Sequence, residues 1–383
     1  MTDRTHGARA VALVGPAGSG KTSLAEALLF AAGATRKRGS VDAGTSVGDA
    51  SREARKRRGS TEPNLMRFDW MGDLYGLIDM PGAPECAGDT GTMLSVADLA
   101  LVVIDPDPAH LPLVAPVLEQ LEGLGLPHAL FVNKIDQARG SIEDLLEALQ
   151  PMSKAALVAR QIPIRAGERV AGFIDLALER AWHYRPDQRS QQVPLAAYLK
   201  EDEAAARFHM LEQLADHDDV LLEQLLSDEA PSLKTIFDDL VRETAAGLVV
   251  PVLFGSALNG FGIRRLLKML RHDTPLATQT AARLDLDEGA AKVFRIVQGN
   301  AHGRLALTRV FGAALPDHPV LGGGHGAPIQ TGALFAMQGA ATTKLHGAGP
   351  GEIVAISGAD ALNAGDVVGV GGAVGREAVT AGS

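Results

Sequence analysis

The chain has 383 residues, which is more than one ordinary hydrophobic core accommodates and predicts about two or three domains. Hydrophobic residues make up 46% of the sequence and charged residues 21%, which excludes an intrinsically disordered protein, and the single cysteine, Cys86, excludes an intrachain disulfide or a site with several thiolate ligands. The formal net charge of -10 argues against a protein whose whole surface coats nucleic acid, although a local basic patch can still contact RNA.

The first predicted elements flank a glycine-rich loop. The apolar run VALVG at 11–15 predicts a strand, and SLAEALLFAAG at 23–33 has the spacing of a helix. In a loop such as GPAGSGKT, backbone N–H groups point at phosphate oxygens, the lysine adds positive charge and the threonine hydroxyl can reach Mg²⁺. The Lys-Thr pair favours this interpretation over a plain turn. We therefore predict a nucleotide phosphate loop formed by Gly15, Pro16, Ala17, Gly18, Ser19, Gly20, Lys21 and Thr22.

The following segments predict a mobile loop, a hairpin and two buried strands. Residues 34–64 are polar and glycine-rich without a clear period, and the hairpin after them ends at Asp79. A carboxylate at the end of a sheet strand lies where open α/β sheets bind ligands, and it can hold Mg²⁺ through a water. The apolar runs at 100–105 and 128–136, with a helical segment between them, predict a parallel α/β sheet.

Two short motifs at strand ends predict recognition of guanine. The NKID motif, Asn133 to Asp136, follows a strand, and its Asp136 carboxylate can accept two hydrogen bonds from guanine N1 and N2. Adenine offers no such pair, so a site of this kind discriminates strongly between the two bases. A surface turn is the alternative interpretation of NKID. After the last sheet strand, a backbone N–H of Ser256, Ala257 or Leu258 can reach guanine O6.

The domain organisation follows from changes in composition along the chain. The predicted fold class is an α/β P-loop GTP-binding domain at 1–275 with an inserted α+β subdomain at about 140–247, followed by an all-β barrel domain at 285–383. The inserted part combines extended and acidic helical segments, whereas the last part has short apolar runs separated by Gly, Asp and Pro. Because no apolar run is long enough to span a membrane, we expect a cytoplasmic protein with no membrane partner.

Taken in order, GPAGSGKT, RRGST, DMPG, NKID and GSAL resemble the five nucleotide motifs of translational GTPases. The long insertion between NKID and GSAL is similar to that of the elongation factor G group, and VFRIVQGNAHGRLALTRVFGAAL resembles the opening of that group's second, barrel domain. The resemblance covers about residues 9 to 370. It implies a monomeric GTP/GDP- and Mg²⁺-dependent switch whose partner is the ribosome, both RNA and protein.

The resemblance also implies roles for single residues. Gly18, Ser19, Gly20 and Lys21 would hold phosphates, while Asn133, Lys134, Asp136, Ser256 and Ala257 would read guanine. Thr22 would bind Mg²⁺, and Thr61 of the mobile loop would reach the ion only when a γ-phosphate is present. A plain loop hydroxyl is the alternative for Thr61. Gly82 would donate its N–H to the γ-phosphate, so Lys21, Thr61 and Gly82 would act directly in hydrolysis.

Three departures from the family pattern bear on function. Ala83 stands where the family usually has a histidine that orients the attacking water, and the nearby Glu85 is more simply a solvated side chain. Gly18 stands where the standard factor has aspartate, which indicates a divergent elongation factor G-like branch. The chain also ends before the family's further domains, so we expect either a fragment, the favoured explanation, or a complete short GTPase.

The sequence is compatible with three hypotheses about function. The leading hypothesis is a GTP-dependent switch acting in translation, in which the basic run Arg52, Arg55, Lys56, Arg57 and Arg58 faces ribosomal RNA or is simply a solvated loop. The second is a module that senses GTP or GDP without hydrolysing it, which Ala83 favours. The third, an ATP-using P-loop enzyme, is disfavoured by Asp136.

Overall fold

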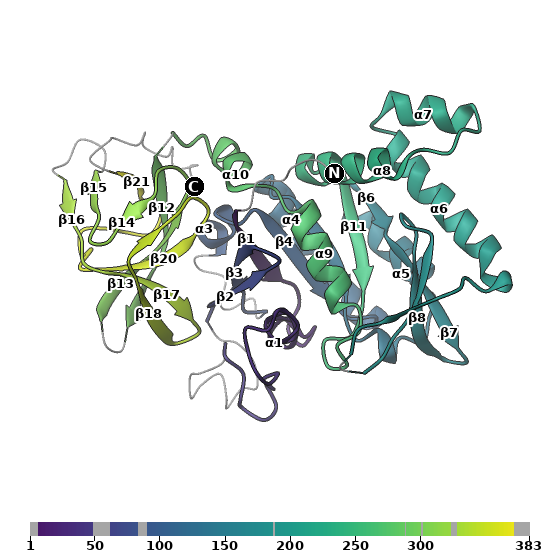
Figure 1. Cartoon of the computed structure of the whole chain (residues 1–383), viewed down its shortest axis with the longest axis horizontal. Helices are drawn as coiled ribbons and strands as arrows, with labels where there is room; N and C mark the ends of the chain where they lie inside the picture. The colour runs from purple at the N-terminus through teal and green to yellow at the C-terminus, as the bar shows by residue number, and fades with distance from the viewer. Residues whose placement is uncertain are drawn as a thin grey trace. The chain divides into compact units, whose positions relative to one another are not determined.

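The computed structural model describes residues 7–48, 62–82, 90–186, 188–287, 289–299, 302–322 and 328–370 (Figure 1). These residues fall into two compact units. The first unit contains residues 13–31 and 99–274, and the second contains the described residues among 4–12, 32–98 and 275–383.

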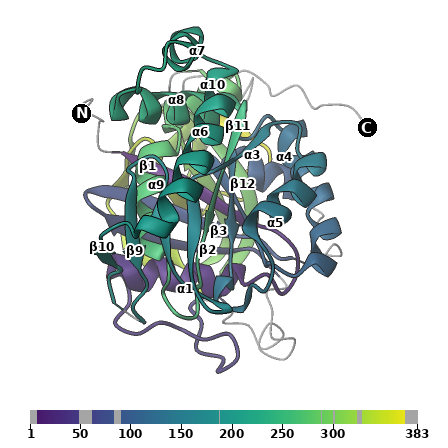
Figure 2. The same cartoon turned by 90° about the vertical axis from the view of Figure 1, so that its right-hand side faces the viewer.

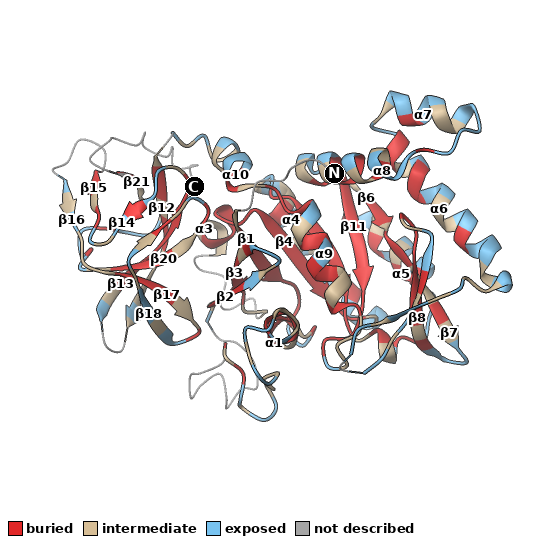
Figure 3. Cartoon of the chain, in the orientation of Figure 1, coloured by how far each residue is buried: buried red, intermediate tan, exposed pale blue. Residues whose placement is uncertain are grey.

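The first unit is built around four parallel strands. They are β4 (Leu99–Ile104), β5 (His128–Val132), β11 (Val249–Phe254) and β6 (Ala156–Ala159), in the order β4-β5-β11-β6. Every residue of β4, β5 and β11 is buried, as expected for apolar strands covered on both faces (Figure 3). The register pairs Leu101 with Ala129 and Leu130 with Val252, so the carboxyl ends of these strands lie along one edge.

Helices of the same unit follow or precede these strands along the chain. They are α1 (Lys21–Ala32), α4 (Ala115–Gly123), α5 (Ile142–Leu149) and α9 (Ile263–Asp273), with short 3-10 turns η2 (Pro108–Leu113), η3 (Ile135–Gln137) and η4 (Gln150–Met152). Helix α5 begins after Ser141, whose hydroxyl oxygen accepts the Glu143 N–H at 3.0 Å and so caps the helix. Basic Arg271 and His272 occupy the last turn of α9, where they complement the helix dipole.

An additional sheet and three helices interrupt the unit between β6 and β11. Strands β7 (Gln161–Ala166), β8 (Arg169–Asp175), β9 (Arg180–His183) and β10 (Gln191–Val193) form an antiparallel sheet, followed by η5 (Ala197–Leu199), α6 (Lys200–Ala215), α7 (Asp219–Leu226) and α8 (Leu233–Ala246). One apolar cluster joins the three helices to β6 and β11, with Leu214, Leu221 and Leu240 among its fully buried members. The three helices lie in the upper half of the view in Figure 2. Strand β6 lies inside the range expected for the insertion but pairs with β11 of the central sheet.

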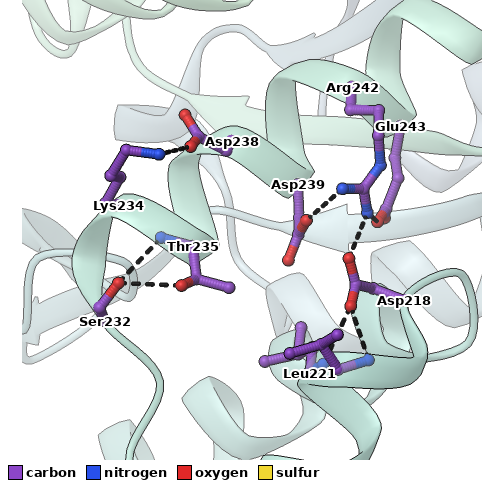
Figure 4. A network of polar contacts seen from close by, with 10 residues as sticks. Asp218, Leu221, Ser232, Lys234, Thr235, Asp238, Asp239, Arg242 and Glu243 are labelled. Carbon is purple, nitrogen blue, oxygen red and sulfur yellow. Dashed lines mark hydrogen bonds and ion pairs between the residues drawn. The ribbon is translucent and has the colours of Figure 1, made fainter. Parts of the chain in front are cut away.

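A polar network connects α7 to α8 (Figure 4). The Asp218 side chain accepts the Val220 and Leu221 N–H groups and so caps α7, and its second oxygen accepts from Arg242 at 2.9 Å. Arg242 also contacts Asp239 at 2.8 Å and the fully buried Glu243 at 3.0 Å, so one guanidinium is shared by three carboxylates.

The second unit contains the expected hairpin. Strands β2 (Asn64–Trp70) and β3 (Asp73–Asp79) pair antiparallel, and β3 lies between β2 and β1 (Ala8–Val14) in the strand order. Met71 and Gly72 both have positive φ, 52° and 88°, as the twist of a two-residue hairpin turn requires. The Phe68 and Tyr75 rings stack across the hairpin with centroids 5.0 Å apart.

The C-terminal part of the second unit consists of antiparallel β-structure. An eight-stranded sheet has the order β16-β15-β21-β12-β13-β20-β17-β18, and a smaller sheet pairs β14 with β19. The bounds are β12 (Ala290–Gly299), β13 (Gly303–Val310), β14 (Leu315–Pro316), β15 (Val320–Gly322), β16 (Ile329–Gln330), β17 (Leu334–Gln338), β18 (Ala341–Leu345), β19 (Gly347–Ala348), β20 (Ile353–Ser357) and β21 (Val367–Val370). Alternating residues such as Val293, Ala306 and Val354 fill its core.

A buried carboxylate joins three segments of the second unit. Asp98, just after helix α3 (Thr90–Ser95), accepts the Ala10 N–H of β1 and the Arg309 guanidinium of β13, each at 2.7 Å. It also accepts the Thr280 hydroxyl of α10 (Ala277–Arg283) at 2.5 Å. Asp98 and Arg309 are fully buried, so each needs the other to offset the cost of desolvating its charge.

The predicted fold class is confirmed. A parallel-rich sheet with helices and an inserted α+β part precedes antiparallel β-sheets. No helix within the described ranges combines the length and the apolar character needed to cross a lipid bilayer.

Candidate nucleotide-binding site

The phosphate loop connects β1 to α1, and its backbone conformation requires glycine. Gly15, Gly18 and Gly20 have φ of 131°, 78° and 94°. A Cβ atom on Gly15 would lie 2.2 Å from the Val103 carbonyl oxygen, and one on Gly20 would lie 2.3 Å from Asn133 Nδ2. Helix α1 begins at Lys21, so the loop ends at a helix N-terminus, where backbone N–H groups and the helix dipole favour an anion.

Lys21 folds back over the loop. Its Nζ donates to the carbonyl oxygens of Gly15 at 2.9 Å and Pro16 at 3.0 Å. The Ser19 N–H donates to the Pro16 carbonyl oxygen at 3.3 Å, which keeps the loop tightly curved. Lys21 and Thr22 are both buried, so their ammonium and hydroxyl groups are shielded from bulk water and would interact strongly with a ligand seated in the loop.

The NKID motif is bonded directly to the phosphate loop. Asn133 follows β5, and its Nδ2 donates to the Ser19 carbonyl oxygen at 2.9 Å. Lys134, in the left-handed conformation with φ of 55°, donates through Nζ to the Gly18 carbonyl oxygen at 2.7 Å. Two motifs that lie more than a hundred residues apart in the sequence are thus held together as one site.

Asp136 provides the main indication of a ligand. It lies in η3, and its Oδ1 is buried without a hydrogen-bond partner among the described residues. A desolvated carboxylate oxygen costs free energy until a donor reaches it. The N1–H and N2–H₂ donors of guanine would satisfy an acceptor of this kind, whereas adenine has an acceptor at N1.

The loop after β11 is hydrogen-bonded to the NKID motif. The Ala257 N–H donates to Asn133 Oδ1 at 2.9 Å, and the Ile135 N–H donates to the Gly255 carbonyl oxygen at 3.0 Å. Ser256 is buried, and the adjacent Leu258 is exposed. Of the three backbone N–H groups that were candidates to reach guanine O6, that of Ala257 is engaged with Asn133 in this structure.

The remaining predicted site residues lie in the second unit or outside the described residues. Asp79 ends β3 and is fully buried, and Gly82 follows it in a half-buried segment. Thr61, Ala83, Glu85, Cys86 and the basic run at 52–58 lie outside the described residues. The hydroxyl of Thr22 and the carboxylate of Asp79 are hard oxygen donors of the kind Mg²⁺ prefers.

Asp105 and His110 lie outside the sequence motifs, and they form a chain of polar contacts that ends at Lys134. Asp105 follows β4, and its Oδ2 lies 3.3 Å from Lys134 Nζ, while His110 Nδ1 lies 3.0 Å from both Asp105 oxygens. Burial alone would raise the pKa of the Asp105 carboxyl, but the hydrogen bonds from His110 and the Asp107 N–H, with the charge of Lys134, lower it below its ordinary value. Asp105 could have been identified from the sequence because it follows a predicted strand, and ligands bind at the carboxyl ends of sheet strands.

The fold and this site define a P-loop GTP-binding protein. Residues 6–275 match the family described as elongation factor Tu GTP binding domain, and residues 288–371 match elongation factor G domain 2. The chain therefore belongs to the translational GTPase family, in its elongation factor G-like group. The resemblance inferred from the motifs is confirmed.

Individual relatives agree with this assignment. An elongation factor G-like protein of Synechocystis is 35% identical over 361 residues, covering 93% of this chain and 53% of the relative. Peptide chain release factor 3 of Lactobacillus johnsonii is 28% identical over 81% of this chain and 60% of its own length. A crystal structure of a Thermus thermophilus protein has a TM-score of 0.85 at 27% identity, covering 94% of this chain and 54% of that one. The chain spans about half the length of the curated relatives it matches.

Proposed function

We propose that this chain binds GTP and GDP with Mg²⁺ and acts as a guanine-nucleotide-dependent switch in translation, with the ribosome as its partner. The observation that carries the proposal is the buried, unpartnered Oδ1 of Asp136 beside a phosphate loop that Asn133 and Lys134 bond directly. Under this proposal one ligand donates hydrogen bonds from its base to Asp136 and places its phosphates in the loop. Guanosine di- and triphosphates have both groups.

Each residue of the site has a role in this proposal. Backbone N–H groups of Gly18, Ser19 and Gly20 and the Lys21 ammonium bind the β- and γ-phosphates. Thr22 and Asp79, joined by Thr61, would hold Mg²⁺, which neutralises phosphate charge when bound. Gly82 donates its N–H to the γ-phosphate. Asn133, Lys134 and Asp136, with the loop of Ser256, Ala257 and Leu258, read the base.

A second candidate function is a nucleotide sensor that does not hydrolyse GTP. The observation in its favour is Ala83, whose methyl group cannot orient a water for attack on the γ-phosphate. Loss of one positioned polar group typically lowers a rate by about 10² to 10⁴. Hydrolysis by the switch is therefore proposed to be slow unless another group supplies this function.

The ribosome is proposed as partner because of family membership and the charge of the sequence at 52–58. Relatives carry the names ribosome-releasing factor 2 and peptide chain release factor 3. The basic run at 52–58 supplies five cations that suit the RNA backbone in a chain that is otherwise acidic. We propose that the chain acts as a cytoplasmic monomer.

Calorimetric titration with GDP, ADP and xanthosine diphosphate in magnesium buffer tests the proposal. The wild type is expected to prefer GDP over ADP by about 10⁴, because ADP leaves the Asp136 carboxylate unpaired. Asp136→Asn is expected to lose GDP affinity by about 10²-fold and to gain affinity for xanthosine diphosphate, since an amide can donate to the extra base oxygen.

The matched control is Asp144→Asn, which makes the same change at an exposed position of α5 and is expected to bind GDP as the wild type does. Displacement of GDP by equimolar ADP would support an ATP-using enzyme instead. Absence of any heat with GDP and with ADP would show that the proposal is wrong.

A further inference from the structure

The loop that follows β11 is closed by an aromatic residue from its far end. Ser256 and Phe261 exchange two backbone hydrogen bonds of 3.0 Å each, which makes residues 256–261 a closed loop. The Phe261 ring stacks on the ring of Tyr184 with centroids 4.6 Å apart and planes inclined by 2°. Tyr184 belongs to the inserted subdomain and lies outside all five nucleotide motifs.

Tyr184 is itself held by the inserted sheet. Its N–H donates to the Ala171 carbonyl oxygen of β8 at 2.8 Å, and its ring lies 5.7 Å from that of the buried Phe173. Burial raises the pKa of the Tyr184 hydroxyl, and its oxygen has no hydrogen-bond partner in the described part of the chain. The contribution of Tyr184 is therefore its flat ring and not its hydroxyl.

The position of the closed loop determines where the base-reading side chains lie. The Gly255 carbonyl oxygen accepts the Ile135 N–H, which immediately precedes Asp136, and the Ala257 N–H anchors Asn133 Oδ1. There is little space for adjustment, because a Cβ atom on Gly255 would lie 2.2 Å from the Phe261 carbonyl oxygen and 2.8 Å from the Phe131 ring. A displacement of Phe261 is thus transmitted to Asn133 and Asp136.

We propose that Tyr184 is a positioning residue for guanine recognition, through which the inserted subdomain supports the loop that aligns Asn133 and Asp136. The inference rests on the proposed function, since it concerns the same nucleotide site. A stacked aromatic pair adds a specific geometric restraint to its buried area, and leucine cannot reproduce that restraint.

The test compares Tyr184→Leu, Tyr184→Phe and Tyr198→Leu with the wild type by calorimetric titration with GDP and with inosine diphosphate, which lacks the 2-amino group. Tyr184→Leu is expected to weaken GDP binding about tenfold and inosine diphosphate binding less than about threefold, so that base selectivity falls. Tyr184→Phe keeps the ring and is expected to match the wild type. Tyr198→Leu repeats the change at an exposed tyrosine of η5 and is expected to have no effect.

A purely structural role for Tyr184 would weaken binding of both ligands by the same factor, and that result would overturn the inference. Phe261→Leu provides a second route if Tyr184→Leu does not fold, because losing either ring removes the same stack and should reduce selectivity equally. Combining the two changes is expected to cost no more than either one, whereas additive losses would contradict the inference. Failure of the wild type to bind GDP would instead overturn the proposed function, and the inference with it.

Discussion

Gly20 of the phosphate loop lies so close to Asn133 of the NKID motif that only a hydrogen atom fits between them. A methyl group there would lie 2.3 Å from Asn133 Nδ2, on a backbone with φ of 94° that L-residues rarely adopt. The hydrogen bond from Asn133 to the Ser19 carbonyl oxygen depends on this close approach. The spacing between the phosphate loop and the NKID motif therefore depends on Gly20.

Gly20→Ala is expected to weaken GDP binding by at least about 100-fold, because backbone strain and the contact with Asn133 both oppose the bound geometry. The matched variant is Gly18→Ala, which has a positive φ of 78° but no neighbouring atom within 4 Å of the added methyl. It is expected to lose no more than about tenfold. Equal losses in a titration with GDP would show that strain alone, and not the approach of Asn133, limits this position.

At the scale of elements, the junction of α7 and α8 carries more negative than positive charge. Asp218, Asp239 and Glu243 share Arg242 (Figure 4). Glu243 is fully buried and Asp239 nearly so, whereas the Arg242 side chain is half-exposed. Burial raises the pKa of Glu243 from 4.5 to about 7, and the Asp239 carboxylate adds to the rise. Hydrogen bonds from the α7 backbone act in the opposite direction on Asp218, whose pKa they lower.

The raised pKa of Glu243 predicts a pH-dependent stability. Because the folded-state pKa lies above the unfolded value, the folded chain holds the proton more tightly, and its free energy of unfolding decreases as the pH rises from about 4.5 to about 7. The charged side chain costs up to about 3 kcal/mol above that range. Glu243→Gln removes this term and is expected to gain stability relative to the wild type at pH 8 but not at pH 5.

Thermal melting followed by circular dichroism at both pH values measures this difference. The control is Glu201→Gln, at an exposed position of α6, which is expected to melt as the wild type does at both values. A wild type and a Glu243→Gln variant whose melting temperatures differ equally at pH 5 and pH 8 would contradict the prediction.

The nucleotide motifs could be recognised in the sequence because each is a local signal with a fixed chemical task. Glycines, a Lys-Thr pair and NKID all follow strands, and strand ends of a parallel sheet converge. Tyr184 and Asp105 were missed because their roles depend on partners 77 and 29 residues away, Phe261 and Lys134, and no local pattern encodes such contacts. Strand β6 was assigned to the insertion range because a four-residue apolar run does not reveal which sheet it joins.

At the scale of the whole molecule, the proposed function predicts that nucleotide binding and hydrolysis can be separated. The base and phosphate residues described here lie in one compact unit, whereas Asp79 and Gly82 lie in the other, and Ala83 follows Gly82 directly in the sequence. Tight binding with slow turnover is therefore the expected behaviour of this chain. Under the proposed function the reaction is GTP hydrolysis, and Ala83 is the reason to expect a low rate.

Ala83→His is expected to accelerate GTP turnover by about 10²-fold or more by supplying a polar group that orients the attacking water. Phosphate release is measured for the wild type and the variant, each with and without ribosomes. Ala83→Leu adds bulk without a polar group and is expected to leave turnover at the wild-type level. No acceleration by histidine would mean that water is positioned from elsewhere, and rapid release by the wild type under both conditions would exclude the sensor function.

The ion pair between Asp98 and Arg309 has a practical consequence for dissecting this protein. A genetic cut near residue 275 would follow the apparent domain boundary, yet it would leave Asp98 with neither the guanidinium of Arg309 nor the hydroxyl of Thr280. The severed N-terminal piece would keep the Ala10 N–H as a donor to Asp98 but would lose the cation that balances its charge. We therefore expect a fragment that ends near residue 275 to unfold at a lower temperature than the whole chain.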